Sequence, residues 1–448
     1  MTHTDENLKR RTGQVAWRNR VLASGAAAVL AALAATPAAA VPPTPAPAIP
    51  TLAYSPNSPN SPNSPNSPDR EPLLVSVTPL GTQTRAQIVA STLKHGFKGT
   101  TDDLKAIRHD VAAYRIVYRT TTPAGAPTTA SGLLALPVPP ATRPGRPSRP
   151  LPTVIHTHGS MTFRGRAPSL SFLGPDGTAA HAYAAGGRGV IAPDYPGLGE
   201  GPGRHPFMDN ASSVSATLDL LKAVRTLPAL RLSHQAYVTG FSQGGQVAMA
   251  VGRAVAAGAV PHLRLAGLRA GAGPYDLQHV EIPAMIDGTV PGRAAVILLA
   301  YVLTAQNALH SPSLYRDPAE VFRAPYAARV EGLFDGTHKE EEIIPQLPAT
   351  VRELFTPAWY ENLRRPTGPL LDVVNRIDTT CAWTPKVPVT LYSATGDHEA
   401  PIANTLSCAR QLTARGARAK VVDQGATTNH FGVFQSSMLD VAKAFPGA

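Results

Sequence analysis

The sequence YVTGFSQGGQVAMA, residues 237–250, places Ser242 between Gly240 and Gly244. A short apolar run typical of a buried strand precedes this serine, and a helix-forming run follows it. Such a strand–turn–helix setting is typical of a nucleophile elbow, in which the glycines permit a sharp turn that presents the serine Oγ. The alternative is a turn that only closes a βα unit, because a chain with 37 glycines produces this spacing by chance. Ser242 is therefore a candidate nucleophile that requires a base and an acid elsewhere in the chain.

Two later loops supply candidate partners for Ser242. Asp397, in the loop TGDHEAP after an apolar strand pattern, is the predicted acid, which would accept the Nδ1–H of a catalytic histidine. His430, in the loop TTNHFG after the last strand pattern, is the predicted general base. A turn or helix-capping role is the alternative for Asp397, and Glu399 is the second candidate for the acid. The order serine, acid, histidine is the order that α/β-hydrolases use.

An acyl-transfer site also needs backbone N–H groups that bind the oxyanion. The N–H of Gln243, at the start of the predicted helix, is one candidate. The loop that ends TVIHTHGSM, residues 153–161, supplies the second, which we expect at Ser160, with Gly159 or Met161 as the alternatives.

The histidines of that loop also suggest a metal site. His156 and His158 have no further carboxylate or histidine at ligand spacing, and HKEEE at 338–342 does not have the HExxH pattern. We therefore expect no metal and interpret the acidic run as a solvated surface.

Alternating strand and helix patterns begin at about residue 73. Helical patterns, including 243–257, separate most of the later strand-like runs. This alternation predicts an α/β fold with a mostly parallel sheet flanked by helices, whose functional residues lie at the carboxyl ends of the strands. The strand-like runs are at 114–121, 133–138, 153–156, 190–193, 236–239, 265–270, 387–392 and 420–422.

A largely helical stretch between Asp276 and Thr384 exceeds what the sheet requires. It is expected to be a cap, at about 277–384, inserted before the strand that precedes the catalytic acid. Its run AAVILLAYVLTA, residues 294–305, is apolar all round. This helix either fills the interior of the cap or lines a tunnel for an acyl chain.

The N-terminal region has the composition of a secretory signal. Basic residues precede an apolar run at 21–35 and the small residues Ala38–Ala40, which predicts a signal peptide over 1–40 and an exported protein. An uncleaved signal-anchor is the alternative. Residues 41–72 contain four Ser-Pro-Asn triplets and are typical of an extended linker, either a plain spacer or a glycosylated or wall-binding segment. The hydrolase domain is then expected over 73–448.

Charge and cysteine content limit the partners and the compartment. The formal net charge is +11, but the basic residues are scattered without aromatic interleaving, which argues against nucleic-acid binding. Export permits a disulfide between Cys381 and Cys408, the two cysteines of the chain.

Five motifs, in the same order as in a known family, resemble α/β-hydrolases of the secretory lipase family, the lipase A-type triacylglycerol lipases and their bacterial relatives. The resemblance covers about residues 73–446. It implies a lipase or esterase that needs no cofactor, acts on a small-molecule or lipid ester, and makes transient contact with a lipid interface. Arg166 stands where the family often has a cysteine. The motifs are HGSMTFRGRAPS (158–169), APDYPGLGEGPGRHPF (192–207), GFSQGG (240–245), GDHEAP (396–401) and NHFG (429–432).

The residues and the resemblance together predict a secreted carboxylic-ester hydrolase with a Ser242–His430–Asp397 triad and an acyl-enzyme intermediate. A serine peptidase of the same fold is one alternative. A non-catalytic envelope-binding module on a hydrolase scaffold is another.

Overall fold

The computed structural model describes residues 73–138, 149–228, 230–310 and 313–447. The predicted signal peptide and linker lie outside these residues. Within the described ranges, no helix is long and apolar enough to cross a membrane.

The described residues contain one sheet of nine strands in the order β1-β2-β3-β5-β4-β6-β7-β8-β9. Pairing is antiparallel from β1 to β5 and parallel from β5 through β4 to β9, so the prediction of a mostly parallel sheet is confirmed. The strands are β1 (Leu74–Gln83), β2 (Asp110–Thr121), β3 (Pro127–Val138), β4 (Leu151–Thr157), β5 (Gly189–Pro193), β6 (Leu232–Phe241), β7 (Arg264–Gly271), β8 (Val389–Ser393) and β9 (Ala419–Asp423).

Strand β1 was missing from the strands predicted from sequence. It lies at the edge of the sheet, most of its residues are at least partly exposed, and its register against β2 shifts between Pro79 and Gly81. An edge strand that buries little apolar surface has no strong alternation of apolar and polar residues, so periodicity alone does not reveal it.

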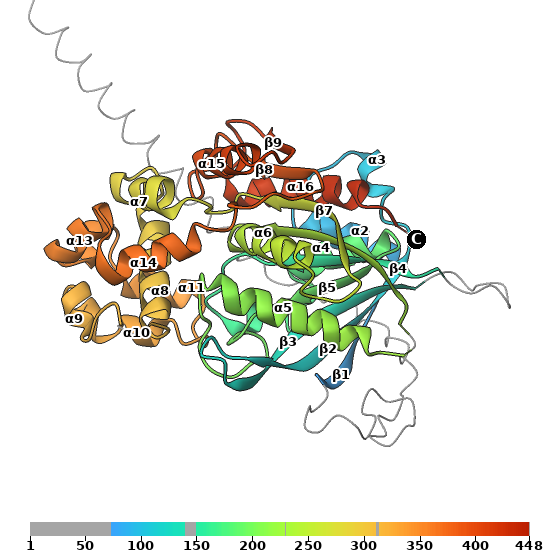
Figure 1. Ribbon diagram of the computed structural model, residues 1–448, viewed down its shortest axis with the longest axis horizontal. Helices are drawn as coiled ribbons and strands as arrows, with labels where there is room; N and C mark the ends of the chain where they lie inside the picture. The colour runs from blue at the N-terminus through green and yellow to red at the C-terminus, as the bar shows by residue number, and fades with distance from the viewer. Residues whose placement is uncertain (1–72, 139–148, 229, 311–312, 448) are drawn as a thin grey trace, which may run out of the picture. The chain divides into compact units, whose positions relative to one another are not determined.

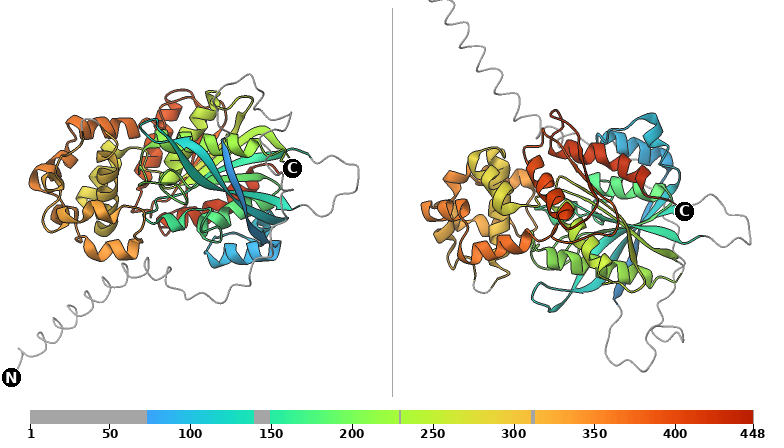
Figure 2. Two further views of the ribbon diagram at one scale, coloured as in Figure 1. Left: turned by 90° about the horizontal axis from the view of Figure 1, so that it is seen from below. Right: turned by 45° about the horizontal axis from the view of Figure 1, so that its top comes forward.

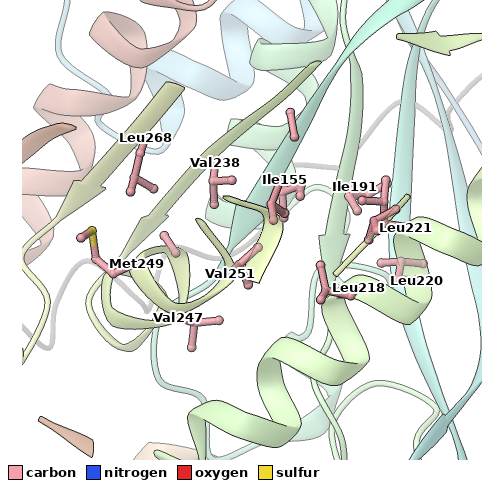
Figure 3. Packing of buried hydrophobic residues seen from close by; sticks show 14 of the residues in the cluster. Ile155, Ile191, Leu218, Leu220, Leu221, Val238, Val247, Met249, Val251 and Leu268 are labelled. Carbon is pink, nitrogen blue, oxygen red and sulfur yellow. The ribbon is translucent and has the colours of Figure 1, made fainter. Parts of the chain in front are cut away.

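Neighbouring residues of the central strands face two different helical layers. Val154 and Tyr237 pack into the cluster that includes helices α2, α4 and α16, whereas Ile155 and Val238 pack into the cluster that includes α5, α6 and α15. Figure 3 shows the second cluster, in which side chains of α5 and α6 meet those of the strands. The helices are α2 (Arg85–Lys94), α4 (Pro175–Ala185), α5 (Asn210–Arg225), α6 (Gln243–Ala256), α15 (Ile402–Thr413) and α16 (His430–Ala444), with the short α3 (Thr101–Leu104) in contact with α16.

Between β7 and β8 the chain leaves the sheet and forms a group of mostly short helices, which we call the cap. Figures 1 and 2 show these yellow and orange helices gathered at one end of the sheet. The cap has its own apolar cluster, to which the core contributes Phe207 and Met208. Its elements are the π-helix η3 (Leu277–Glu281), α7 (Ile282–Asp287), α8 (Gly292–Asn307), α9 (Pro318–Val321), η4 (Tyr326–Ala328), α10 (Val330–Leu333), α11 (Glu340–Ile343), η5 (Ile344–Gln346), α12 (Val351–Leu354), α13 (Pro357–Arg364) and α14 (Gly368–Ile377).

Helix α8 contains the apolar run that the sequence singled out. Leu299 is 2% exposed within the cap cluster, and the Tyr301 ring stacks between Phe207 at 4.2 Å and Phe334 at 4.8 Å. These contacts favour the first of the two interpretations, in which this helix fills the interior of the cap.

The predicted disulfide between Cys381 and Cys408 is present, and both residues are fully buried. It joins the segment that follows the last cap helix to α15, the helix after the loop of the predicted acid. The return of the chain from the cap is therefore covalently tied to the core.

Candidate active site

Ser242 occupies the turn between β6 and α6, as the elbow motif predicts. Its backbone has φ 57° and ψ −127°, a strained conformation for a residue with a side chain. A Cβ on Gly244 would collide with the Thr157 and His158 carbonyls, and one on Gly240 with Thr157 Oγ1 and the Gly244 backbone. Glycine at both positions thus lets the turn press against the end of β4.

The structure brings the three predicted triad residues together. The Nε2 atom of His430 lies 2.9 Å from Ser242 Oγ, and Nδ1 lies 2.8 Å from Asp397 Oδ2. These residues follow or end β6, β8 and β9, whose carboxyl ends meet at one edge of the parallel sheet. The imidazole can therefore bond a hydroxyl at one nitrogen and a carboxylate at the other.

Asp397 is the member of the acid loop that reaches this histidine. Its side chain is fully buried, and its second oxygen, Oδ1, accepts hydrogen bonds from the backbone N–H groups of Glu399 (2.9 Å) and Ala400 (3.0 Å). Asp397 thus makes the turn contacts of the alternative interpretation and bonds His430 as well. Glu399 contributes its backbone to this arrangement.

The surroundings of His430 favour its protonated form. Burial lowers the pKa of the imidazole, but the charge of Asp397 and its hydrogen bond, with the charges of Glu399 and Glu281, outweigh burial and raise the pKa to about 8. A base with this pKa holds a proton well once it has taken one from a hydroxyl.

The two candidate oxyanion donors flank Ser242. Gln243 is the first residue of α6, so its N–H belongs to the helix end that has no intrahelical acceptor. On the other side, a Cβ built on Gly159 would lie 3.5 Å from Ser242 Cβ, which places this loop beside the nucleophile. The Gly159 carbonyl accepts from His158 Nδ1 at 2.7 Å. The Ser160 N–H belongs to the same trans peptide group, so it points away from the His158 ring.

Tyrosine hydroxyl groups hold this loop at both ends. Tyr195 donates to the His158 carbonyl at 3.2 Å, and Tyr301, from cap helix α8, donates to the Met161 carbonyl at 3.0 Å. Asp194 accepts from the N–H and hydroxyl of Ser169, and burial raises the pKa of this carboxyl. The peptide groups between His158 and Met161 are thus fixed from the core and from the cap.

The two histidines considered as metal ligands have other partners. His156 lies 3.0 Å from Asp176 through Nε2, and His158 lies between the carbonyls of Gly159 and Asp194. Among the residues that the structure describes, no group of three or more His, Cys, Asp or Glu side chains is arranged to hold a metal ion.

The acidic run at 338–342 is mostly exposed, as the sequence predicts, but two of its residues also contact the segment that follows the oxyanion loop, residues 158–161. Glu340 is 3.4 Å from Arg166, and Thr162 Oγ1 donates to the His338 carbonyl at 3.2 Å. Glu341 and Glu342 are exposed, as expected. No pattern in the sequence places a cap segment next to this loop, because the contact joins elements about 175 residues apart.

Two further buried groups near the triad escaped the sequence analysis. Glu281 is 3% exposed and accepts from Asn404 Nδ2 at 2.6 Å; burial raises its pKa to about 8, and it interacts electrostatically with His430 and Asp397. His205 contacts Gln243 and lies in the motif at 192–207. That motif is the one signal in the sequence that pointed to either residue.

Comparisons with known proteins place this site in a known fold. No protein-family model and no curated protein sequence matches the chain. Among solved structures, a Legionella pneumophila protein assigned as a hydrolase has a TM-score of 0.72 at 22% identity, covering 83% of this chain and 97% of its own. The ligand-bound rice cell wall degrading esterase LipA of Xanthomonas oryzae has 0.71 at 25% identity, with the same coverage. Candida antarctica lipase A has 0.58 at 15% identity, covering 84% of this chain and 83% of its own.

The protein therefore has the α/β-hydrolase fold. The resemblance to lipase A-type hydrolases that its motifs indicated is confirmed, since lipase A of Candida antarctica and the esterase LipA of Xanthomonas oryzae share this architecture.

Proposed function

We propose that the protein hydrolyses carboxylic esters through an acyl-enzyme on Ser242. The observation that carries this proposal is the continuous hydrogen-bonded sequence from Ser242 Oγ through His430 to the buried Asp397. Nucleophile, base and orienting acid in mutual contact are what acyl transfer requires.

In the proposed reaction, Ser242 Oγ attacks the ester carbonyl carbon while His430 Nε2 accepts its proton. The backbone N–H groups of Gln243 and Ser160 bind the negatively charged oxygen of the tetrahedral intermediate. Collapse breaks the bond to the alcohol, which leaves with the proton from His430. Water then attacks the acyl-enzyme, with His430 again accepting and returning the proton, and the acid is released. Asp397 keeps the imidazole in the required tautomer throughout, and the sequence of steps uses no cofactor.

The proposed substrates are small-molecule or lipid esters. The supporting evidence is the fold shared with esterases and a lipase, together with a cap that covers the carboxyl ends of the strands. We further propose that the enzyme acts outside the cytoplasm, since residues 1–40 have the composition of a signal peptide and the chain contains a disulfide.

A series of nitrophenyl esters from acetate to palmitate, assayed beside a peptidyl anilide and an emulsified triglyceride, tests this proposal. We expect ester turnover and no anilide hydrolysis. Anilide hydrolysis without ester turnover would point to a peptidase. If the folded protein turned over none of these substrates, the result would favour the non-catalytic envelope-binding module.

A further inference from the structure

His205 is a buried histidine whose two ring nitrogens both have partners. It is 2% exposed in the loop between β5 and α5. Its Nδ1 lies 2.9 Å from the Pro196 carbonyl oxygen, and its Nε2 lies 3.1 Å from the side-chain Nε2 of Gln243. Gln243 is the residue directly after the nucleophile.

The protonation state of His205 follows from these contacts. Burial lowers the pKa of the imidazole to about 3, so the ring is neutral and carries one N–H. The Pro196 carbonyl can only accept, which assigns that hydrogen to Nδ1. The Nε2 atom is therefore an acceptor, and the Gln243 amide donates to it.

The loop around His205 restricts the position of the ring. Gly197 has φ +76°, and a Cβ there would collide with the backbone of Arg204 and His205, so the start and the end of the loop are in direct contact. The imidazole stacks on the Tyr195 ring with centroids 5.8 Å apart and planes at 11°. The acceptor atom thus has a fixed position behind the start of α6.

Among the residues that the structure describes, Gln243 has no other side-chain hydrogen bond that would orient its amide. The residue is 1% exposed, and its Oε1 has no hydrogen-bond partner among the described residues. A buried amide held by one hydrogen bond depends strongly on that bond, because its loss leaves a further polar group unpaired.

We propose that His205 is a positioning residue for the oxyanion donor: through the Gln243 side chain it fixes the residue whose backbone N–H faces the reacting carbonyl. This inference rests on the proposed ester hydrolysis and adds a second layer to its oxyanion hole. A donor displaced by a fraction of an ångström binds the transition state less well while substrate binding is unchanged, so the effect belongs in kcat rather than KM.

The test measures kcat and KM for nitrophenyl butyrate, and Ki for an alkyl boronic acid that mimics the tetrahedral intermediate. In His205→Phe the ring volume is retained and the acceptor is lost; kcat should fall about tenfold or more, Ki should rise in parallel, and KM should stay within about twofold. His205→Gln, which returns an acceptor near the position of Nε2, should recover most of kcat.

His181→Phe is the matched control, because His181 is also a buried histidine whose Nδ1 bonds a backbone carbonyl, on α4. It should lower the unfolding temperature and leave kcat unchanged.

Gln243→Met removes the donor of the same hydrogen bond, and it replaces His205→Phe in the test if that variant does not fold. It should lower kcat as His205→Phe does, and the double variant should be no worse than either single one. Full kcat in either single variant, a loss confined to KM, or no recovery in His205→Gln would overturn the assignment. If wild-type protein does not turn over the ester, the proposed function fails and this assignment fails with it.

Discussion

The core and the cap of this molecule are organised differently: strand pairing arranges the core, whereas packing of short helices arranges the cap. In the core, parallel strands fix where each loop ends, so residues 188 positions apart, Ser242 and His430, meet within hydrogen-bond distance. In the cap, helices of three to sixteen residues surround their own apolar cluster and reach the oxyanion loop through single contacts such as Tyr301 with Met161. The comparison indicates that the core brings the proposed catalytic residues together, whereas the cap contacts the loop beside them.

The largest effect that this comparison predicts is the loss of catalysis when a core residue of the triad is removed. Ser242→Ala and His430→Ala should each lower kcat for a nitrophenyl ester by roughly 10⁴-fold or more, and the double variant should be little worse, because a triad acts as a unit. Circular dichroism should show both variants folded. A Ser242→Ala protein that keeps more than about a hundredth of wild-type kcat would contradict the assignment.

The next largest effect on kcat should distinguish Asp397 from Glu399, the two carboxylates of one loop. Asp397→Asn should lower kcat by roughly 10²-fold to 10⁴-fold, because an amide does not hold the His430 tautomer or stabilise the imidazolium. Glu399→Gln is the matched control and should keep kcat within a few fold, since the backbone N–H of Glu399 remains bonded to Asp397. The opposite ranking of the two variants would move the acid to Glu399.

The core was predictable from the sequence for a physical reason. The elbow glycines, the acid loop and the final histidine each follow a strand with a strong apolar pattern, and topology brings such loops together. The contacts of the cap were not predictable, because Glu340 meets Arg166 through folding across the sheet edge and the four-residue helices are too short to show a period. Similarly, Glu281 lies in a π-helix, whose five residues are too few to show a periodic pattern that would predict a buried carboxyl.

The pH dependence tests the core and the cap together, because carboxyl groups of both parts lie near His430. With the pKa of His430 raised to about 8, kcat/KM should rise about tenfold per pH unit below that value and level off above it, since neutral imidazole is the base. Glu281, on the cap side, has a pKa raised to about 8 by burial, so its carboxyl is largely neutral below that pH, and Glu281→Gln should move the profile only slightly to lower pH. A flat profile between pH 6 and 9 would contradict this coupling.

The same shift in the pKa of His430 affects stability. A folded-state pKa above the unfolded value of 6.5 means that protonated His430 stabilises the fold fully below about pH 6.5, and that this contribution is lost as the pH rises through about 8. Comparing the unfolding free energies of wild type and His430→Ala across this range measures that loss.

The smallest expected effect on specificity concerns the interior of the cap. Leu299→Ala should lower the free energy of unfolding by about 2–5 kcal/mol, because it leaves a cavity in a packed cluster. The ratio of kcat/KM for octanoate to that for acetate should stay within about twofold, since Leu299 packs against the cap and not an acyl chain. A selective loss of octanoate turnover would show that α8 lines the acyl site after all.

The most direct test of the central claim, that Ser242 is the nucleophile of an ester hydrolase, is reaction with a fluorophosphonate followed by mass spectrometry of the proteolysed protein. We predict one adduct, on the Ser242 peptide, formed in proportion to the loss of esterase activity and absent from Ser242→Ala. Full inactivation with the adduct on another residue, or retained esterase activity in protein fully labelled at Ser242, would contradict the claim.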